Sequence, residues 1–426
     1  MMKVVITTVG SRGDLQPFIS LGLGLKKAGY EVLIISAKNE EDFVRKYGLN
    51  FYALDVNIQE LMEGNNHVQE FAKGSNPLKF IISHLKGSKN LKTLMIKTQR
   101  EIWNACQDAD LIVFHPGMPI GYFIAQVNHK KSVLLNPFPV VATKDYPSIL
   151  FYSLPRLGRA FNSLTHAIFY KVFWALAKSA IVEFWKENVL TKVDFKTSPI
   201  QQQIISGRPV INAYSPLTFQ PAAEWGNNVQ TVGSLIIENE SNFIPPKELE
   251  DFIKNGEPPI FIGFGSMKDI NSFTKTFEII SEAVTKTKQR AVIGLGWTKN
   301  SFSRTVPENI FLIENIPFSW LFPQMKLVVH HGGAGTTAAG LIAGKPTIII
   351  PHIADQPGWG LRVYELGVGS KPISKKRLSA ENLSKAIMFA LQPEIVNAAN
   401  QLGQSMRTEN GIEKAIDIIN KYMNDK

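Results

Sequence analysis

The chain has 426 residues, of which 44% are hydrophobic and 19% charged, a composition that builds a folded core and excludes intrinsic disorder. At about 150 residues per domain, this length predicts two domains. The 46 basic and 36 acidic side chains give a net charge of +10, which favours phosphates, nucleic acids or anionic lipids as partners without distinguishing among them.

The sequence has neither the features of an export signal nor those of a membrane span. The apolar run up to Val9 is too short for a signal peptide, and the most apolar stretch, residues 172–185, is interrupted by Lys178 and Glu183. The single cysteine, Cys106, excludes an internal disulfide and a cysteine-rich metal site, and its expected role is that of a small buried hydrophobe. We therefore expect a cytoplasmic protein.

The first half alternates short apolar runs with helix-length stretches, which is the pattern of a parallel β/α sheet. A strand at residues 4–9 is followed by a turn and by a helix that has Pro17 in its first turn and ends at Gly29. Further strands are expected at residues 32–36, 111–114 and 133–136. This half is therefore predicted to be a Rossmann-like domain.

Two segments of this half do not follow the alternation. Residues 71–100 contain seven Lys or Arg and no Asp or Glu, with apolar residues at helical spacing, and residues 151–185 are dense in aromatic side chains. Ordinary core packing with a solvated basic face is one interpretation. The other is an apolar acceptor pocket beside a basic face that makes peripheral contact with anionic membrane.

The second half repeats the alternation, with strands expected at residues 260–263, 291–294, 310–313, 327–330 and 347–350. Residues 214–234 are rich in Pro, Gly and Asn, so we place a domain boundary at Trp225. The predicted fold class is α/β with two Rossmann-like β/α/β domains. These comprise residues 1–225 and 226–400, and a C-terminal helix over residues 401–426 is expected to pack back on the first domain.

The strongest functional signal follows the strand expected at residues 327–330. His330 and His331 end that strand, a glycine turn follows, and Thr336 and Thr337 begin a helix. Glycines let backbone N–H groups approach an anion, the helix N-terminus adds about half a positive charge, and hydroxyls add donors. The segment predicts a phosphate site to which His331 also donates; a purely structural glycine turn is the alternative.

Other site types fit less well. No Lys follows the glycines as in a P-loop, and the glycine spacing is not that of a dinucleotide-binding GxGxxG loop. Neighbouring strand residues such as His330 and His331 point to opposite faces, which disfavours a shared metal. Ser266 is not in a hydrolase elbow and is expected either to meet the phosphate or to be an ordinary turn residue.

The turn Gly10–Asp14 follows the first strand, at the edge where open parallel sheets bind ligands. Asp14 has two interpretations there, a catalytic base and a helix N-cap. Ser11 and Arg12 of the same turn are candidates for contacts with a ligand.

Three segments, GSRGDLQP, GFGSM and HHGGAGTTAAGLIAGKPTIIIPHIADQPGWG, together resemble the family-one nucleotide-sugar glycosyltransferases. The match is closest to the branch of the sterol 3-β-glucosyltransferases and the bacterial aglycone glycosyltransferases. The resemblance implies a GT-B fold, whose two domains face a central cleft. It also implies inverting transfer of a hexose, with glucose as first choice, from a UDP-sugar to a hydroxyl of a hydrophobic acceptor. A sterol, a triterpenoid and an aromatic or polyketide aglycone are the acceptors left open.

The resemblance also implies roles for single residues. His331 and Ser266 contact the diphosphate, and Asp355 and Gln356 bind the sugar hydroxyls. Backbone groups from Ile313 onward replace the tryptophan on which plant relatives stack uracil. The donor is thus expected to contact Ser11, Arg12, Ser266, Ile313, His331, Gly333, Ala334, Gly335, Thr336, Thr337, Asp355 and Gln356.

Many relatives use a histidine as the base, whereas the matching turn here makes Asp14 the expected base and leaves its helper open. Because a helix terminus and His331 can hold the diphosphate, neither a divalent metal nor another cofactor is expected. A TDP-deoxysugar-dependent antibiotic aglycone glycosyltransferase and a non-catalytic nucleotide-sugar binder are the alternatives. A nucleic-acid binder is disfavoured because no RNA- or DNA-binding motif accompanies the positive charge.

Overall fold

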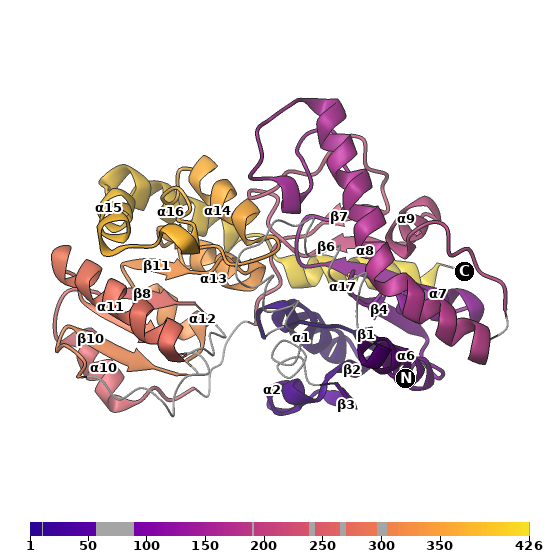
Figure 1. The fold of residues 1–426 in the computed structure, drawn as a ribbon. Coiled ribbons are helices and arrows are strands. Elements are labelled where there is room, and N and C mark those ends of the chain that lie inside the picture. Colours follow the sequence, from indigo (N-terminus) through magenta and orange to yellow (C-terminus); the bar gives the residue numbers. More distant parts are fainter. Residues whose placement is uncertain are drawn as a thin grey trace. The chain divides into compact units, whose positions relative to one another are not determined.

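The computed structural model of the chain describes residues 1–10, 12–56, 89–189, 191–237, 243–264, 270–295, 305–314 and 316–425. These residues form two compact units. Unit 1 comprises Met1–Ile236 and Glu409–Lys426, and unit 2 comprises Ile237–Thr408. Each unit has its own parallel sheet with helices around it, which confirms the predicted α/β class (Figure 1).

The sheet of unit 1 has seven parallel strands in the order β3-β2-β1-β4-β5-β6-β7. Its central strands are continuous apolar runs because helices cover both faces of such a sheet. Strand order reverses between β1 and β4, which is where open α/β sheets bind ligands. The strands are β1 (Lys3–Thr7), β2 (Glu31–Ala37), β3 (Asn50–Leu54), β4 (Leu111–Phe114), β5 (Lys131–Asn136), β6 (Val210–Asn212) and β7 (Val229–Thr231).

Helices cover both faces of this sheet. On one face α1 (Arg12–Lys27) packs against α17 (Gly411–Asn424), and a Cβ atom at Gly24 would lie 2.7 Å from Ile412 and Ile416, so glycine permits this close approach. The long helix α8 (Arg159–Asn188) packs with its neighbours on the other face. The other helices of unit 1 are α2 (Glu41–Arg45), α6 (Lys89–Ala105), α7 (Ile120–Val127) and α9 (Pro199–Ile205), with 3-10 turns at Lys38–Glu40 and Ile149–Phe151.

The aromatic residues of α8 belong mostly to the core of unit 1. Phe169, Trp174, Phe184 and Trp185 are at most 6% exposed, and both tryptophans contact Phe123 of α7. The core interpretation therefore holds for these residues, and not the interpretation as an acceptor pocket. None of the helices in the described ranges, α8 included, is long and apolar enough to cross a membrane.

The bounds of the units differ from the expected ones for clear reasons. Trp225 lies inside unit 1, because β7 follows it and adds an edge strand to the first sheet. Within the segment expected to return to the first domain, α16 (Pro393–Met406) instead packs against α13 (Ala334–Ile342) in unit 2. Only the part from Glu409 onward, which contains α17, belongs to unit 1.

Unit 2 has a five-stranded parallel sheet in the order β10-β9-β8-β11-β12. This order repeats that of the first five strands of unit 1, so β11 corresponds to β4. Its strands are β8 (Ile260–Gly263), β9 (Ala291–Gly294), β10 (Ile310–Ile313), β11 (Leu327–His330) and β12 (Thr347–Ile349). Its further helices are α10 (Lys247–Lys254), α11 (Ile270–Lys286), α12 (Phe318–Leu321), α14 (Gln356–Glu365) and α15 (Ala380–Ala390), with 3-10 turns at Phe322–Gln324 and Lys375–Arg377.

Candidate active site

The glycine turn of unit 2 connects β11 to α13. His330, the last residue of β11, is fully buried, and its Nδ1 atom accepts the N–H of Gly332 at 2.9 Å. Gly332 has φ +93°, and a Cβ atom there would lie 2.6 Å from Cγ2 of Ile349, so no other residue fits without strain. Gly333 then caps α13. The predicted strand, turn and helix are all confirmed.

The N-terminus of α13 carries the electrostatic potential of this turn. The first backbone N–H groups of a helix, here from Ala334, Gly335 and Thr336, have no partner within the helix and bear partial positive charge. Thr336 is partly buried. Thr337 is fully buried, and its hydroxyl donates to the carbonyl of Gly333 at 2.9 Å. The hydroxyl of Thr337 therefore stabilises the helix start, and that of Thr336 is the one left to a ligand.

His331 lies beside this helix start. A Cβ atom at Gly333 would be 2.8 Å from Nε2 of His331. Any residue larger than glycine at this position would therefore clash with the imidazole ring. Burial lowers the pKa of His331 to about 4, which makes the ring neutral at pH 7. Its Nδ1 atom is buried and has no hydrogen-bond partner in the described part of the chain. His331 can thus donate a hydrogen bond to a phosphate, while the positive potential comes from α13.

Three histidines meet at this edge of unit 2. The ring of His331 is 6.2 Å from that of His330 and 6.3 Å from that of His352. Burial is the main cause that lowers the pKa of His352, to about 3, and nearby Lys375 adds to it. Within the described ranges, no cluster of His, Cys, Asp or Glu side chains is arranged to hold a metal ion.

Asp355 and Gln356 begin α14 and lie against the glycine turn. A Cβ atom at Gly332 would be 3.3 Å from Cβ of Gln356, which places the two loops in contact. Oε1 of Gln356 accepts the N–H groups of His352 at 2.7 Å and Ile353 at 2.9 Å. Only the amide NH2 end of Gln356 is therefore available to a sugar, as a donor. Asp355 accepts the indole N–H of Trp359 at 2.9 Å, which orients its carboxylate.

Of the other residues expected to contact the nucleotide sugar, the structure describes Ile313 and leaves three side chains outside the described residues. Ile313 is buried at the end of β10, and its carbonyl accepts the N–H of Leu295 at 2.9 Å, so the backbone beyond Ile313 is what could read a base. Ser11, Ser266 and the side chain of Arg12 lie outside the described residues.

Asp14 lies in the first turn of α1, which begins at Arg12, and so it is not the N-cap residue. Gly10 has φ +136°, and a Cβ atom there would be 2.4 Å from Oδ2 of Asp14. The carboxylate is thus folded back over the loop that follows β1, at the carboxyl edge of the sheet. The assignment of Asp14 as the base stays a prediction.

His115 is a buried histidine at the same edge of the unit 1 sheet that the sequence interpretation did not single out. It follows β4, next to the end of β1, and is 6% exposed. Its Nδ1 atom accepts the N–H of Gly117 at 2.9 Å. The available signal was a histidine directly after a buried apolar strand, followed by Pro and Gly, which parallels the segment that begins at His330.

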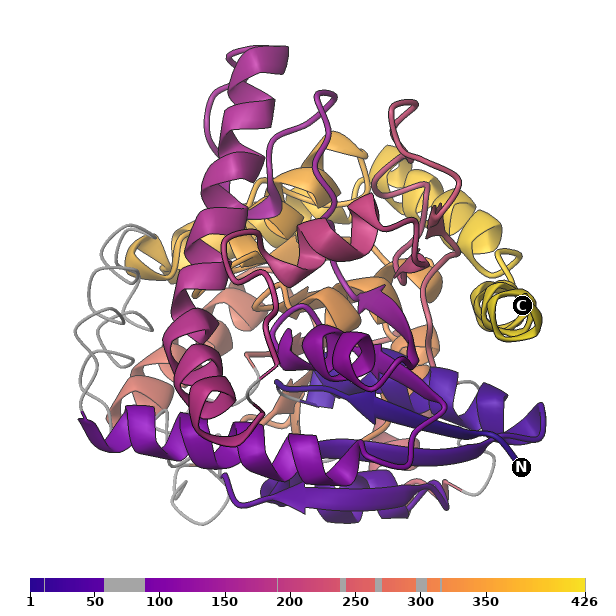
Figure 2. The ribbon, with the colours of Figure 1, turned by 90° about the vertical axis from the view of Figure 1, so that its right-hand side faces the viewer.

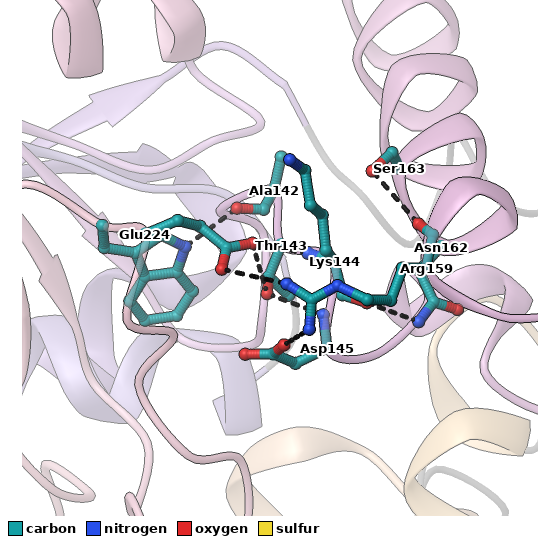
Figure 3. Close-up of polar contacts among 9 residues, drawn as sticks. Ala142, Thr143, Lys144, Asp145, Arg159, Asn162, Ser163 and Glu224 are labelled. Atoms are coloured by element: carbon teal, nitrogen blue, oxygen red, sulfur yellow. Dashed lines mark hydrogen bonds and ion pairs between the residues drawn. The ribbon is translucent and has the colours of Figure 1, made fainter.

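A second missed residue, Glu224, anchors the loop that follows β5 (Figure 3). Its carboxylate accepts the N–H of Lys144 at 2.6 Å and the hydroxyl of Thr143 at 3.1 Å, and Arg159 at the start of α8 lies 4.0 Å away. Arg159 also pairs with Asp145 at 3.0 Å. The N–H of Lys144 is the main cause that holds the pKa of Glu224 below its usual value. Because these partners lie far from Glu224 in sequence, no local motif marks them.

Comparisons with known proteins identify the family of the chain. The family model described as the glycosyltransferase family 28 N-terminal domain matches residues 4–147. The model described as the erythromycin biosynthesis protein CIII-like, C-terminal domain matches residues 278–416. The chain is 33% identical over 434 residues to a sterol 3-β-glucosyltransferase of Arabidopsis thaliana, covering 99% of this chain and 68% of that relative.

A sterol 3-β-glucosyltransferase of Komagataella phaffii is 32% identical over 434 residues, which cover 99% of this chain and 34% of that relative. The chain thus spans about a third of that protein. Among solved structures, the glycosyltransferase of kitacinnamycin superposes with a TM-score of 0.70 at 14% identity, covering 99% of both chains. The glycosyltransferase VinC in complex with dTDP gives a TM-score of 0.69 at 14% identity, covering 98% of this chain and 99% of that one.

The structural likenesses show that the two units form the GT-B fold of glycosyltransferases. The sequence likeness to the Arabidopsis thaliana enzyme extends over nearly the whole chain. The chain is therefore a glycosyltransferase and belongs to the family of the sterol 3-β-glucosyltransferases.

Proposed function

We propose that the protein transfers a hexose, with glucose as first choice, from a UDP-sugar to the hydroxyl of a sterol or a similar hydrophobic alcohol. The observation that supports the nucleotide-sugar donor is the contact between the glycine turn at Gly332 and the loop of Asp355 and Gln356. One unit thereby holds donors for a diphosphate beside a carboxylate and an amide for sugar hydroxyls. The names of the relatives support the sterol and the glucose.

The proposed mechanism is a single displacement with Asp14 as general base. Asp14 takes the proton of the acceptor hydroxyl as that oxygen bonds to the anomeric carbon, and the bond from that carbon to the nucleoside diphosphate breaks. The leaving group gains negative charge, which the N-terminus of α13 and a hydrogen bond from His331 stabilise. Attack from the face opposite the leaving group gives the β-glycoside. These groups supply the stabilisation without a metal ion.

A dTDP-sugar is the second candidate donor, because a solved structure of the same fold contains dTDP. A thermal-shift panel of UDP, dTDP and GDP, each with its glucose conjugate, separates the two candidates, since a ligand that binds only the native state raises Tm. We expect UDP and UDP-glucose to give the largest shifts. A larger shift with dTDP would move the proposal to dTDP-sugars, and no shift with any nucleotide would refute the donor site.

The acceptor is tested by incubating the protein with the best donor and a panel of sterols, triterpenoids and aromatic aglycones. We expect the sterols to gain the mass of one hexose. Transfer only to aglycones would replace the proposed acceptor. Donor binding without transfer to any acceptor would favour a nucleotide-sugar binder that lacks catalytic activity.

We also propose peripheral contact with anionic membranes, through the N-terminal end of α8 in addition to the basic segment of residues 71–100. Two described lysines of that basic segment are engaged within the protein, Lys92 with Glu183 and Lys97 with Asp55, while residues 57–88 lie outside the described ranges. The start of α8 and the loop before it stand away from the sheet of unit 1 in both views (Figures 1 and 2).

The supporting observation is that residues 153–160 are all exposed. Leu154, Leu157 and Leu164 are 45%, 66% and 54% exposed. Arg156 and Arg159 lie among them, and Arg159 is 67% exposed at its side chain although it pairs with Asp145. Leucines that enter the headgroup region beside arginines are typical of membrane-surface anchors. We expect flotation with anionic vesicles that weakens in Leu157→Ser. Equal flotation with neutral and anionic vesicles, or none, would refute this contact.

A further inference from the structure

Three buried polar side chains at the carboxyl edge of the unit 1 sheet have no hydrogen-bond partner among the residues that the structure describes. They are the hydroxyls of Thr8 and Ser36 and the Nε2 atom of His115. Thr8 and Ser36 are completely buried and His115 is 6% exposed. Since roughly 90% or more of buried polar groups are hydrogen-bonded, three unsatisfied atoms in one place indicate a polar partner other than the described residues.

The three residues form one row across neighbouring strands. β1 lies between β2 and β4. The hydrogen-bond ladder continues past the ends of β1 and β4, because Thr8 N donates to Ile35 O at 3.0 Å and His115 N donates to Thr7 O at 2.9 Å. Ser36, Thr8 and His115 therefore share one register position, with strands about 4.8 Å apart, and project from the same face of the sheet. We call these three residues the polar row.

The hydrogen bond at Nδ1 fixes the protonation of His115. Because Nδ1 accepts the N–H of Gly117, the neutral ring carries its proton on Nε2. Burial lowers the pKa of His115 to about 3, so the ring is neutral at pH 7. His330 makes the same bond to Gly332 at the corresponding strand end of unit 2. The polar row thus presents one N–H donor and two hydroxyls, a set that suits a water molecule.

One end of the polar row packs against α1. The ring of Phe18 packs edge-on against the ring of His115, with 5.4 Å between centroids. Asp14 precedes Phe18 by four residues and therefore lies on the same face of α1. The carboxylate of Asp14 covers Gly10, two residues after Thr8. Asp14 and the polar row thus both lie against the loop that follows β1.

We propose that the polar row holds an ordered water and that His115 is, through this water, a positioning residue for Asp14. The water accepts the Nε2–H of His115 and donates toward the carboxylate, which keeps one carboxylate oxygen directed at the acceptor hydroxyl. A buried water that makes about three hydrogen bonds is a permanent part of a structure. The inference rests on the proposed role of Asp14 as the base.

The test compares steady-state kinetics of His115→Phe and His115→Gln. Phenylalanine keeps the ring packing and removes the donor, so we expect kcat to fall about 10- to 100-fold, which is a part of the roughly 100- to 10,000-fold that general base catalysis contributes. KM for the nucleotide sugar should change less than about twofold, because the variant leaves donor binding intact. The amide of His115→Gln can donate in place of Nε2 and should restore most of the lost kcat.

Thr8→Val removes one hydroxyl of the polar row at nearly constant shape and should also lower kcat. Thr287→Val is its matched control, because Thr287 is a buried threonine of unit 2 whose hydroxyl donates within its own segment, to Ala283 O at 2.9 Å. We expect this control to keep the wild-type kcat. If His115→Phe does not fold, Thr8→Val decides, and an unchanged kcat there overturns the inference.

The inference is also overturned if folded His115→Phe keeps the wild-type kcat, or if His115→Gln is as slow as His115→Phe. Asp14→Asn in the same assay separates the role of Asp14 as the base from the role of the polar row. If Asp14→Asn still turns over, the base assignment itself is wrong. If Asp14→Asn is inactive while His115→Phe and Thr8→Val keep the wild-type kcat, only the role of the polar row is wrong.

Discussion

Two neighbouring glycines of the turn after β11 should separate folding from donor binding. Gly332 has φ +93°, and a Cβ atom there would lie 2.6 Å from Cγ2 of Ile349. Gly333 has φ −62° and ψ 142°, which any residue adopts, but a Cβ atom there would lie 2.8 Å from Nε2 of His331. We therefore expect Gly332→Ala to reduce stability and Gly333→Ala to reduce the affinity for UDP.

The magnitudes follow from these contacts. Backbone strain at Gly332 costs about 1–3 kcal/mol and overpacking against Ile349 about 1–3 kcal/mol, so Gly332→Ala should lower the free energy of unfolding by about 2–6 kcal/mol. In Gly333→Ala the ring of His331 must move from its place. A hydrogen bond to a charged group is worth about 1.5–3 kcal/mol, so Kd for UDP should rise about 10- to 150-fold.

Urea unfolding measures the stability of both variants, and calorimetric titration measures their affinity for UDP. Gly367→Ala is the matched control in the same unit, since Gly367 has φ +69° and no described atom within 4 Å of its Cβ position. It reports backbone strain without overpacking. Wild-type UDP affinity in Gly333→Ala, or equal stability of Gly332→Ala and Gly367→Ala, would refute this reasoning.

Three further predictions concern other contacts. Gln356→Ala removes the acceptor of two backbone N–H groups and should lower the free energy of unfolding by about 1–3 kcal/mol in urea titrations; an unchanged midpoint would contradict this. Glu224→Gln weakens the anchor of the loop after β5 and should lower the free energy of unfolding by about 1 kcal/mol without changing Kd for UDP; an unchanged urea midpoint would contradict this. Burial lowers the pKa of His166 to about 4, below about 6.5 in the unfolded chain. This contribution to stability is complete above pH 6.5 and is lost as the pH falls toward 4, by about 2 kcal/mol at pH 5; urea midpoints at pH 7 and pH 5 should therefore differ less in His166→Phe than in the wild type.

Local patterns were sufficient for much of the fold. The strands at residues 111–114 and 327–330 were predicted with their observed bounds, because both are short apolar runs between clear turns. The edge strand β7, Val229–Thr231, was missed because only Val229 of its residues is buried, so it lacks an apolar run. The domain boundary was placed too early for the same reason.

Side-chain roles that depend on tertiary contacts could not be read from spacing. Thr337 looks like a ligand contact in sequence, but its hydroxyl donates to Gly333. Gln356 has the position of a sugar contact, yet its carbonyl end holds the backbone of its own loop. His115 was missed because its neighbours in the polar row come from strands that are distant in sequence.

The most direct test of the account is the product formed from UDP-glucose and a sterol by the wild-type protein and by Asp14→Asn. Mass spectrometry detects the hexosylated sterol, proton NMR gives its anomeric configuration, and a UDP titration checks that the variant still binds the nucleotide. We expect a β-glucoside from the wild type, and no product from Asp14→Asn despite wild-type affinity for UDP. An α-linked product, or undiminished turnover by Asp14→Asn, would contradict the account.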